Sequence, residues 1–402
     1  MKKLNPIVIS IYDVLKNTNF TGTKILYVGE GEYMIKCILL LPPNKDLDNL
    51  IEILPNLKMS VAANDIKIGK CEGKKIEILF GKCDLSRVKF SPRLLNKNSL
   101  KVSFMSAFGL KTIDFMDGAS CHMLNGGRTR MGKTTFLYYM LTSLYFQNKG
   151  KMNLYICSSK ITDFFPFEDL PNVEFAEDEE QMRTVLEHVD NDYNDRRNLL
   201  KTTELKECVD AKGVKKNFPN KFYLFQPIFL LVDEYADYSK ISDIQESIKH
   251  IVRKAGYVNI HVIVCTQRAD ARFTIPPDVK ANLGCRICFT TNGKANSLNI
   301  LDEEGAEKLG GVEGRALLLD GDLSTVQIPH MTYRQCKRLL KPFKRMYKNE
   351  QKGKRLSDNG VSQNVQNMFK ESASKFNFSK QQQSHKRMQS GYEQTGKGWF
   401  ML

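Results

Sequence analysis

Residues 127–134 of this chain read Gly127-Arg128-Thr129-Arg130-Met131-Gly132-Lys133-Thr134. This stretch matches the pattern G-x-x-x-x-G-K-[ST] at every fixed position. A short apolar run ends at Leu124, and the residues from 134 to 147 are predicted to form a helix. A strand, a glycine-rich turn and a helix in this order form the setting in which such a loop binds phosphate groups. The stretch therefore predicts a nucleotide site in an α/β fold.

The chemistry of the loop follows from its residue types. Glycines allow backbone N–H groups to curl around phosphate oxygens, and the start of the helix adds a partial positive charge. We predict that Lys133 bridges the β- and γ-phosphates of ATP and acts in catalysis, and that the Thr134 hydroxyl is a ligand of Mg²⁺. The residues predicted to bind the nucleotide are Gly127, Arg128, Thr129, Arg130, Met131, Gly132, Lys133, Thr134 and Thr135.

Two carboxylates follow an apolar strand predicted at 227–232. Asp233 is expected to hold Mg²⁺ through its water shell, which makes it both a metal and a catalytic residue. Glu234, one position further, is placed to polarise an attacking water. On its own, a strand that ends in Asp-Glu is only moderate evidence for a catalytic site. Because this strand lies about a hundred residues after a phosphate-binding loop, the pair predicts a site that hydrolyses ATP.

A third apolar strand, predicted at 261–264, leads to Gln267. Ligands of open α/β sheets gather at the carboxyl ends of the strands, where this amide would lie. Gln267 is therefore a candidate catalytic residue that senses the γ-phosphate or orients water. From the residue type alone, a buried structural glutamine is an equal alternative.

The pattern of strands and helices predicts three parts. Residues 1–95 form a small α/β or α+β domain, residues 96–347 a mostly parallel sheet covered by helices on both faces, and residues 348–402 a disordered basic tail. In the small domain the expected strands are 24–28, 33–40, 66–68 and 75–80, with one helix at 47–56. In the large domain the expected strands are 153–157, 227–232, 261–264, 286–290 and 315–319, and the expected helices are 134–147, 180–200 and 241–255.

Composition narrows the class of partner. The net charge is +15, which favours a polyanion, either nucleic acid or an anionic membrane surface. No apolar run approaches the roughly 20 residues needed to cross a bilayer, so we expect no membrane span. Ten cysteines are scattered along the chain rather than clustered as a disulfide framework, which indicates a reducing, cytoplasmic location.

Beyond the phosphate loop, several motifs follow one another in a recognisable order. They are Leu231-Val232-Asp233-Glu234-Tyr235-Ala236-Asp237 and the segments at 253–268, 279–289 and 300–309. This order closely resembles the FtsK/SpoIIIE motors, at similar spacing. Residues 60–68 also resemble part of the small domain that precedes the motor in that family.

The resemblance implies a RecA-like core, a homo-oligomeric ring that is usually a hexamer, and movement along double-stranded DNA coupled to ATP hydrolysis. It further implies that ATP lies between subunits and that a neighbouring subunit supplies a catalytic arginine. Arg286 is the first candidate for this arginine, and Arg315 and Arg268 are the alternatives.

The sequence also departs from the family pattern. Met131 stands where a small residue is usual, and Ala269 stands where proline is usual. Neither a membrane-spanning N-terminus nor a C-terminal winged-helix module is evident in the sequence. What is present resembles the compact motors of Gram-positive conjugative elements, plasmids and phages.

Three functions are compatible with these observations. The leading hypothesis is an ATP-driven translocase of double-stranded DNA that acts in transfer or processing of mobile-element DNA. A second is an ATP-switched coupling adaptor whose tail recruits a relaxase or another mobile-element protein, since the tail ends in Trp399-Phe400. A third is a hexameric replicative helicase.

Overall fold

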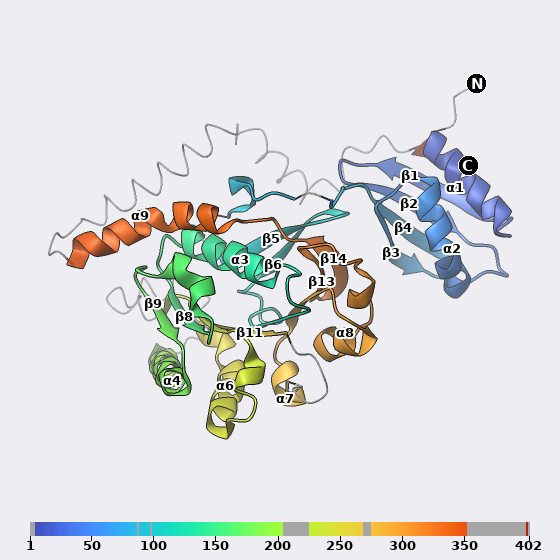
Figure 1. The fold of residues 1–402 in the computed structure, drawn as a ribbon. Coiled ribbons are helices and arrows are strands. Elements are labelled where there is room, and N and C mark those ends of the chain that lie inside the picture. The colour runs from blue at the N-terminus through green and yellow to red at the C-terminus, as the bar shows by residue number, and fades with distance from the viewer. Residues whose placement is uncertain are drawn as a thin grey trace. The chain divides into compact units, whose positions relative to one another are not determined.

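The computed structural model describes residues 5–86, 88–96, 99–203, 225–267, 275–351 and 399–400 (Figure 1). These residues divide into two compact units. The smaller unit contains the described residues up to 86, residues 105–111 and the pair 399–400. The larger unit contains the other described residues.

The smaller unit is an antiparallel sheet with two helices packed on it. Its strands are β1 (Lys24–Glu30), β2 (Met34–Leu40), β3 (Asp65–Glu72) and β4 (Lys75–Gly81), in the spatial order β1-β2-β4-β3. Helices α1 (Pro6–Asn17) and α2 (Leu47–Ser60) bury Ile11, Leu15, Leu50 and Leu57 against the sheet residues Cys37, Leu39 and Ile78. The four strands and α2 confirm the expected elements, whereas α1 was not expected.

Two residues close to the C-terminus also belong to this sheet. Strand β15 (Trp399–Phe400) pairs antiparallel with β1, with Val28 opposite Trp399 and Tyr27 opposite Phe400. Helix α9 (Tyr333–Gln351) continues past the predicted start of the tail at residue 348. The rest of the predicted tail lies outside the described residues, so its disorder stays a prediction.

The larger unit is built on a ten-stranded sheet. The spatial order is β6-β5-β14-β13-β12-β7-β11-β10-β8-β9. The six strands from β12 to β9 run parallel to one another, whereas β13 pairs antiparallel with both β12 and β14. The strands are β5 (Lys101–Ser106), β6 (Gly109–Asp114), β7 (Met123–Gly126), β8 (Asn153–Cys157), β9 (Val173–Ala176), β10 (Ile228–Val232), β11 (Ile260–Thr266), β12 (Cys285–Phe289), β13 (Arg315–Asp320) and β14 (Asp322–Gln327).

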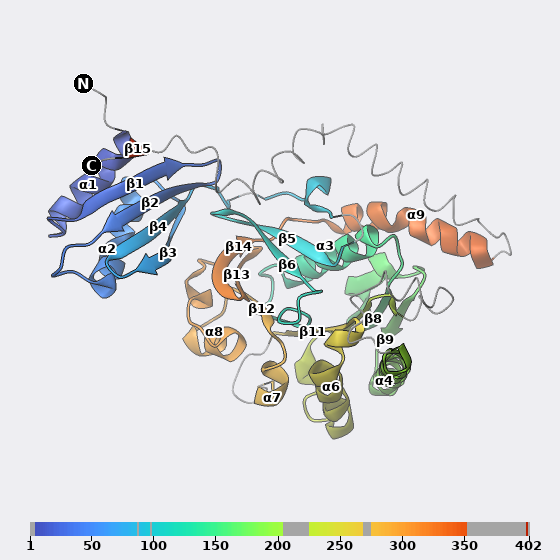
Figure 2. The ribbon, with the colours of Figure 1, turned by 180° about the vertical axis from the view of Figure 1, so that it is seen from behind.

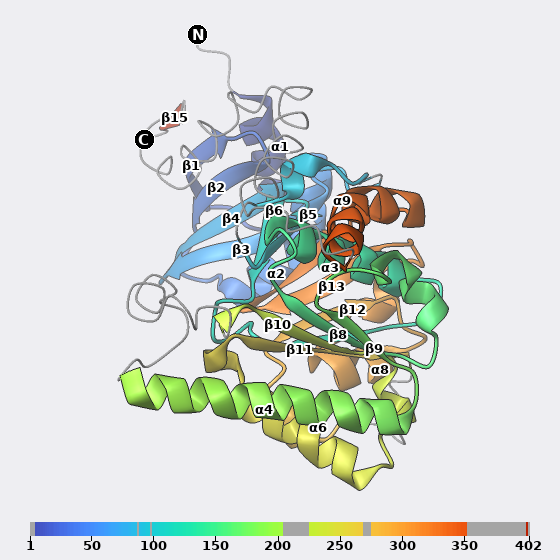
Figure 3. The ribbon, with the colours of Figure 1, turned by 90° about the vertical axis from the view of Figure 1, so that its left-hand side faces the viewer.

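Helices cover both faces of this sheet, as Figures 1 and 2 show from opposite sides. Helices α3 (Lys133–Gln147) and α9 lie on one face, and α4 (Glu179–Thr203) and α6 (Ser242–Lys254) lie side by side on the other (Figure 3). The remaining helices are α7 (Pro277–Lys280) and α8 (Lys294–Leu301), with short 3₁₀ turns η1 (Pro92–Leu94), η2 (Ile161–Phe167), η4 (Tyr235–Asp237), η5 (Gly256–Val258) and η6 (Ala306–Lys308).

Successive residues of the central strands supply two separate cores. In β10, Phe229 and Leu231 face the core shared with α3, whereas Ile228, Leu230 and Val232 face the core shared with α4 and α6. All five are fully buried, which explains why this strand is apolar without alternation. The predicted α/β fold with a mostly parallel sheet is thereby confirmed, with an antiparallel addition at β13 and β14.

One charged side chain lies inside the core between the sheet and helices α4 and α6. Arg196 of α4 is 1% exposed, and its guanidinium donates to three backbone carbonyls. Nη1 donates to Val258 O at 2.8 Å and Asn259 O at 3.3 Å, and Nη2 donates to Gln226 O at 2.8 Å. These acceptors precede β10 and β11, so Arg196 ties α4 to the entry points of two central strands.

We predict that Arg196→Met lowers the free energy of unfolding by about 2 to 4 kcal/mol, because methionine fills similar space and leaves buried carbonyls without their donors. Urea unfolding followed by circular dichroism measures this. Arg197→Met is the matched control, since Arg197 is exposed and adjacent, and its midpoint is expected to stay near that of the wild type. Equal midpoints for both variants would contradict a structural role for Arg196.

Candidate nucleotide-binding site

The phosphate loop joins β7 to α3 at the carboxyl edge of the parallel strands. Gly127 has φ of 131° and Gly132 has φ of 104°, a left-handed region that favours glycine. Both positions are also crowded, since a Cβ at 127 would lie 2.8 Å from Phe289 Cβ and one at 132 would lie 2.9 Å from Gly314 N. The two fixed glycines of the motif are therefore required by backbone conformation and by space.

Lys133 begins α3, and its ammonium folds back over the loop to donate to Gly127 O. Burial lowers the pKa of Lys133, and the nearby Glu234 and Asp233 carboxylates oppose that shift. The structure thus brings together the lysine and the two acidic residues that the sequence predicted for one site. Thr134 and Thr135 follow in the first turn of the same helix and are partly exposed.

Asp233 directly follows β10 and continues its ladder, because its backbone N–H donates to Cys157 O at 2.9 Å. The Ser158 hydroxyl donates to Asp233 Oδ2 at 2.9 Å, while Oδ1 has no donor among the described residues. Burial raises the pKa of Asp233, and the hydrogen bond from Ser158 lowers it. A carboxylate held by one oxygen and open at the other suits a hard cation such as Mg²⁺.

Glu234 is turned toward the next strand by an unusual backbone conformation. Its φ is 54°, a left-handed value that costs a non-glycine residue strain and is typical of functional positions. The carboxylate accepts from the Gln267 backbone N–H at 3.0 and 3.2 Å and from the Thr266 hydroxyl at 3.3 Å. Burial raises the pKa of Glu234, and these donors together with Lys133 lower it.

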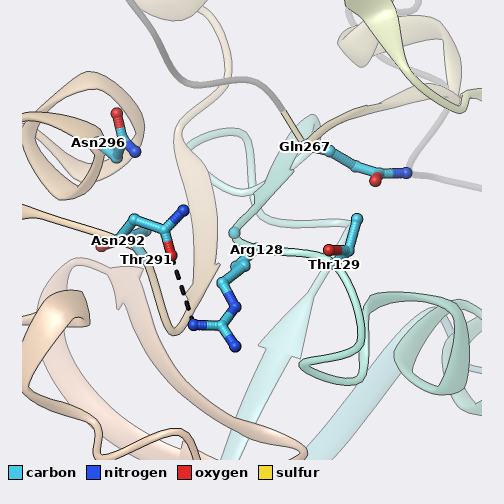
Figure 4. Close-up of a pocket in the computed structure, with 7 residues that line it drawn as sticks. Arg128, Thr129, Gln267, Thr291, Asn292 and Asn296 are labelled. Atoms are coloured by element: carbon cyan, nitrogen blue, oxygen red, sulfur yellow. Dashed lines mark hydrogen bonds between the residues drawn. The ribbon is translucent and has the colours of Figure 1, made fainter.

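A pocket of about 340 Å³ opens beside the phosphate loop (Figure 4). The loop contributes Gly127, Arg128 and Thr129, and Gln267 approaches from the end of β11. In Figure 4 the Arg128 side chain points toward Asn292, to which Nη1 donates at 3.5 Å. Gln267 therefore lies beside the phosphate loop, and its backbone N–H holds the Glu234 carboxylate.

Sequence reasoning missed the wall of this pocket formed by Thr291, Asn292 and Asn296. These residues follow β12 and begin α8, and β12 is the parallel neighbour of β7. The available signal was the polar run Thr290-Thr291-Asn292-Gly293 after an apolar strand, the same arrangement that identified Gln267.

Arg286 is held within its own subunit. Its guanidinium forms an ion pair with Asp302 and donates to Leu283 O at 3.0 Å and Lys280 O at 3.2 Å. The side chain is only 12% exposed. These contacts give Arg286 a local structural role, so its role as the catalytic arginine of a neighbouring site stays a prediction without support from this geometry.

Of the two alternative arginines, only Arg315 lies among the described residues. Arg315 donates from Nε to Gln327 Oε1 at 2.8 Å, across the β13–β14 pair. Arg268 lies outside the described residues, as does Ala269.

The residues of this site lie within a stretch that resembles known proteins. Residues 96–287, which include the phosphate loop, both acidic residues and Gln267, match the model of the FtsK/SpoIIIE family. Over these residues the chain is similar to the FtsK/SpoIIIE family. The resemblance drawn from the order of the motifs is confirmed.

Several curated relatives are DNA translocases of this family. DNA translocase FtsK of Treponema pallidum is 26% identical over 306 residues, which are 72% of this chain and 38% of that protein. DNA translocase SftA of Bacillus subtilis is 23% identical over 329 residues, which are 78% of this chain and 34% of that protein. The chain thus spans little more than a third of the length of these relatives.

Solved structures share the fold. The pCW3 conjugation coupling protein TcpA, in its monomer form with ATPγS, matches with a TM-score of 0.59 at 18% identity, over 84% of this chain and 99% of that one. ATPases 2 and 3 of EssC from Geobacillus thermodenitrificans match with a TM-score of 0.54 at 14% identity, over 66% and 52% of the two chains. Both are ATPase folds, in agreement with the predicted fold class.

Proposed function

We propose that this chain is an ATP hydrolase that translocates double-stranded DNA as a homo-oligomeric ring, in the transfer or processing of mobile-element DNA. The observation that carries the proposal is the grouping of Lys133, Asp233 and Glu234 at the carboxyl edge of the parallel strands, after β7 and β10, which flank β11. Hydrolysis of a phosphoanhydride needs three groups. These are a cation that binds the phosphate oxygens (Lys133), a carboxylate free to bind a metal (Asp233), and a fixed carboxylate that activates water (Glu234).

Each residue then has a defined task. The loop amides and Lys133 bind the phosphate groups of ATP and offset the charge that develops on them. Glu234, fixed by the Gln267 N–H, accepts a proton from the attacking water. The Thr134 hydroxyl and the open oxygen of Asp233 would hold Mg²⁺, which when bound neutralises phosphate charge.

The choice of DNA as substrate rests on the relatives and on charge. Curated relatives bear the name DNA translocase, and TcpA is named as a conjugation coupling protein. A net charge of +15 suits a phosphate backbone. Among the described helices, none is long and apolar enough to cross a membrane. A cytoplasmic location and a tail partner such as a relaxase are part of this proposal.

Steady-state ATP hydrolysis with and without long duplex DNA tests the proposal. We expect duplex DNA to stimulate hydrolysis at least tenfold at low salt and the stimulation to fall as salt rises, since phosphate contacts release counterions. Stimulation by single strands alone would favour a helicase instead. Hydrolysis indifferent to both would contradict the translocase and leave the coupling adaptor.

A further inference from the structure

A second pocket lies at the opposite edge of the sheet from the phosphate loop. Its volume is about 460 Å³. It opens where β7, β11 and β12 begin, between the loop at 115–122, the end of α6 with η5, and the segment at 281–284. These three strands are adjacent and parallel, and the phosphate loop follows the carboxyl end of β7. The two pockets therefore have no residue in common.

The pocket contains a buried hydrogen-bond donor. His122 is 2% exposed, and its Nδ1 accepts from the Val262 backbone N–H at 3.0 Å. Burial lowers the pKa of His122 to about 3, so the ring is neutral and carries its single proton on Nε2. No described residue accepts a hydrogen bond from Nε2. The structure therefore presents a fixed N–H donor whose acceptor is missing from the described protein.

Gly256 keeps this donor accessible. A Cβ at position 256 would lie 3.6 Å from His122 Nε2 and 2.7 Å from Cys121 Sγ. The φ of Gly256 is not positive, so the backbone itself does not require glycine here. The absence of a side chain leaves room beside Nε2 for an atom of a ligand.

The charged side chains that line the pocket are cations, and the nearby Asp117 of the loop at 115–122 is not among the lining residues. Arg253 and Lys254, both exposed, line it from the last turn of α6. None of the described residues lining it is Asp or Glu. The carbonyl end of α6 carries about half a negative charge, which two full positive charges exceed. An acceptor-rich anion would satisfy both the cations and the histidine.

We propose that this pocket, formed by His122, Arg253, Lys254 and Gly256, binds a phosphate group. A phosphate has enough acceptor oxygens to meet one guanidinium, one ammonium and one neutral N–H together. The group could belong to the DNA backbone or to a small phosphate ligand. The site extends the proposed function, because it is a second phosphate site that is separate from the one at which ATP is hydrolysed.

The test uses the full chain loaded with ATPγS and freed of excess nucleotide, so that the phosphate loop is already filled. Inorganic phosphate is titrated by calorimetry at constant ionic strength. We expect one saturable phosphate site in the wild type. In Arg253→Gln and in His122→Asn the affinity for phosphate is expected to fall about tenfold or more, because each variant loses one charge-assisted contact. Lys151→Gln is the matched control, because Lys151 is an exposed cation just before β8, at the same edge of the sheet.

Asparagine at position 122 can still accept from the Val262 N–H while lacking the Nε2 donor, and Arg253→Gln changes only an exposed side chain. No saturable site in the wild type, or equal affinity in Arg253→Gln and the wild type, would overturn the proposal. A repeat titration with a 30-base-pair duplex identifies the source. Competition between duplex and phosphate assigns the site to the DNA backbone, and independent binding assigns it to a small phosphate ligand.

Discussion

Replacing Glu234 with glutamine is expected to reduce ATP turnover by about 10³-fold while ATP binding is retained. Glutamine keeps an oxygen that can accept from the Gln267 N–H, so the local fold is preserved. It loses the ability to accept a proton from water. Single-turnover hydrolysis, together with equilibrium binding of a fluorescent ATP analogue, separates the lost chemistry from retained affinity.

Asp237→Asn is the matched control for this variant. Asp237 is an exposed acid three residues further along the chain, and its contact is with the Ser159 hydroxyl at 3.3 Å. Turnover of Asp237→Asn is expected to stay within about twofold of the wild type, because Asp237 is exposed and solvent screens its charge from Glu234. Turnover in Glu234→Gln close to that of the wild type would assign the general base to another residue.

Lys133→Ala is expected to lose both binding and turnover, which distinguishes it from Glu234→Gln. The ammonium is largely buried beside Glu234 and Asp233, so its removal leaves two carboxylates without their shared cation where phosphate must bind. We expect turnover to fall about 10³-fold and the affinity for the ATP analogue to fall as well.

Arg130→Gln is the control for loss of positive charge in the same loop. Arg130 is exposed, and the loop amides rather than its side chain are expected to meet phosphate. Its effect on affinity is expected to stay within about threefold, because exposed charges are screened by solvent. Unchanged ATP affinity in Lys133→Ala would contradict the assignment of the phosphate loop.

The sequence was most informative where local chemistry and a regular pattern coincide. Strand β8 was predicted at 153–157 and is observed at Asn153–Cys157. Helix α1 was missed because Ile7, Val8, Ile9 and Ile11 are β-branched and favour a strand. The signals for a helix were nevertheless present, since Asn5 caps the helix at Ile7 N and Pro6 occupies its first turn.

The main residues of the site could be predicted from the sequence, whereas the residues that hydrogen-bond to them could not. The motif identifies Lys133, and apolar strands identify Asp233, Glu234 and Gln267. The contacts from Ser158 to Asp233 and from Thr266 to Glu234 depend on the register between parallel strands. Register is a long-range property that the spacing of residues within one strand does not specify.

For Arg286, too, the contacts in the fold could not be predicted from the sequence. Family resemblance suggested a role in a neighbouring subunit's site, but Asp302 lies 16 residues away at the end of α8 and forms an ion pair with it. Such a pair depends on how α8 packs against β12, which sequence spacing does not show. The pocket wall at Thr291 and Asn292 was missed for a similar reason.

Displacement of a third strand from duplex DNA tests the central claim most directly. A labelled oligonucleotide is bound as a triplex at one end of a long duplex, and its release is followed after ATP is added. We expect the wild type to release it in an ATP-dependent manner and Glu234→Gln to release none, although both bind the duplex. Efficient ATP hydrolysis by the wild type without release of the third strand would contradict translocation along double-stranded DNA.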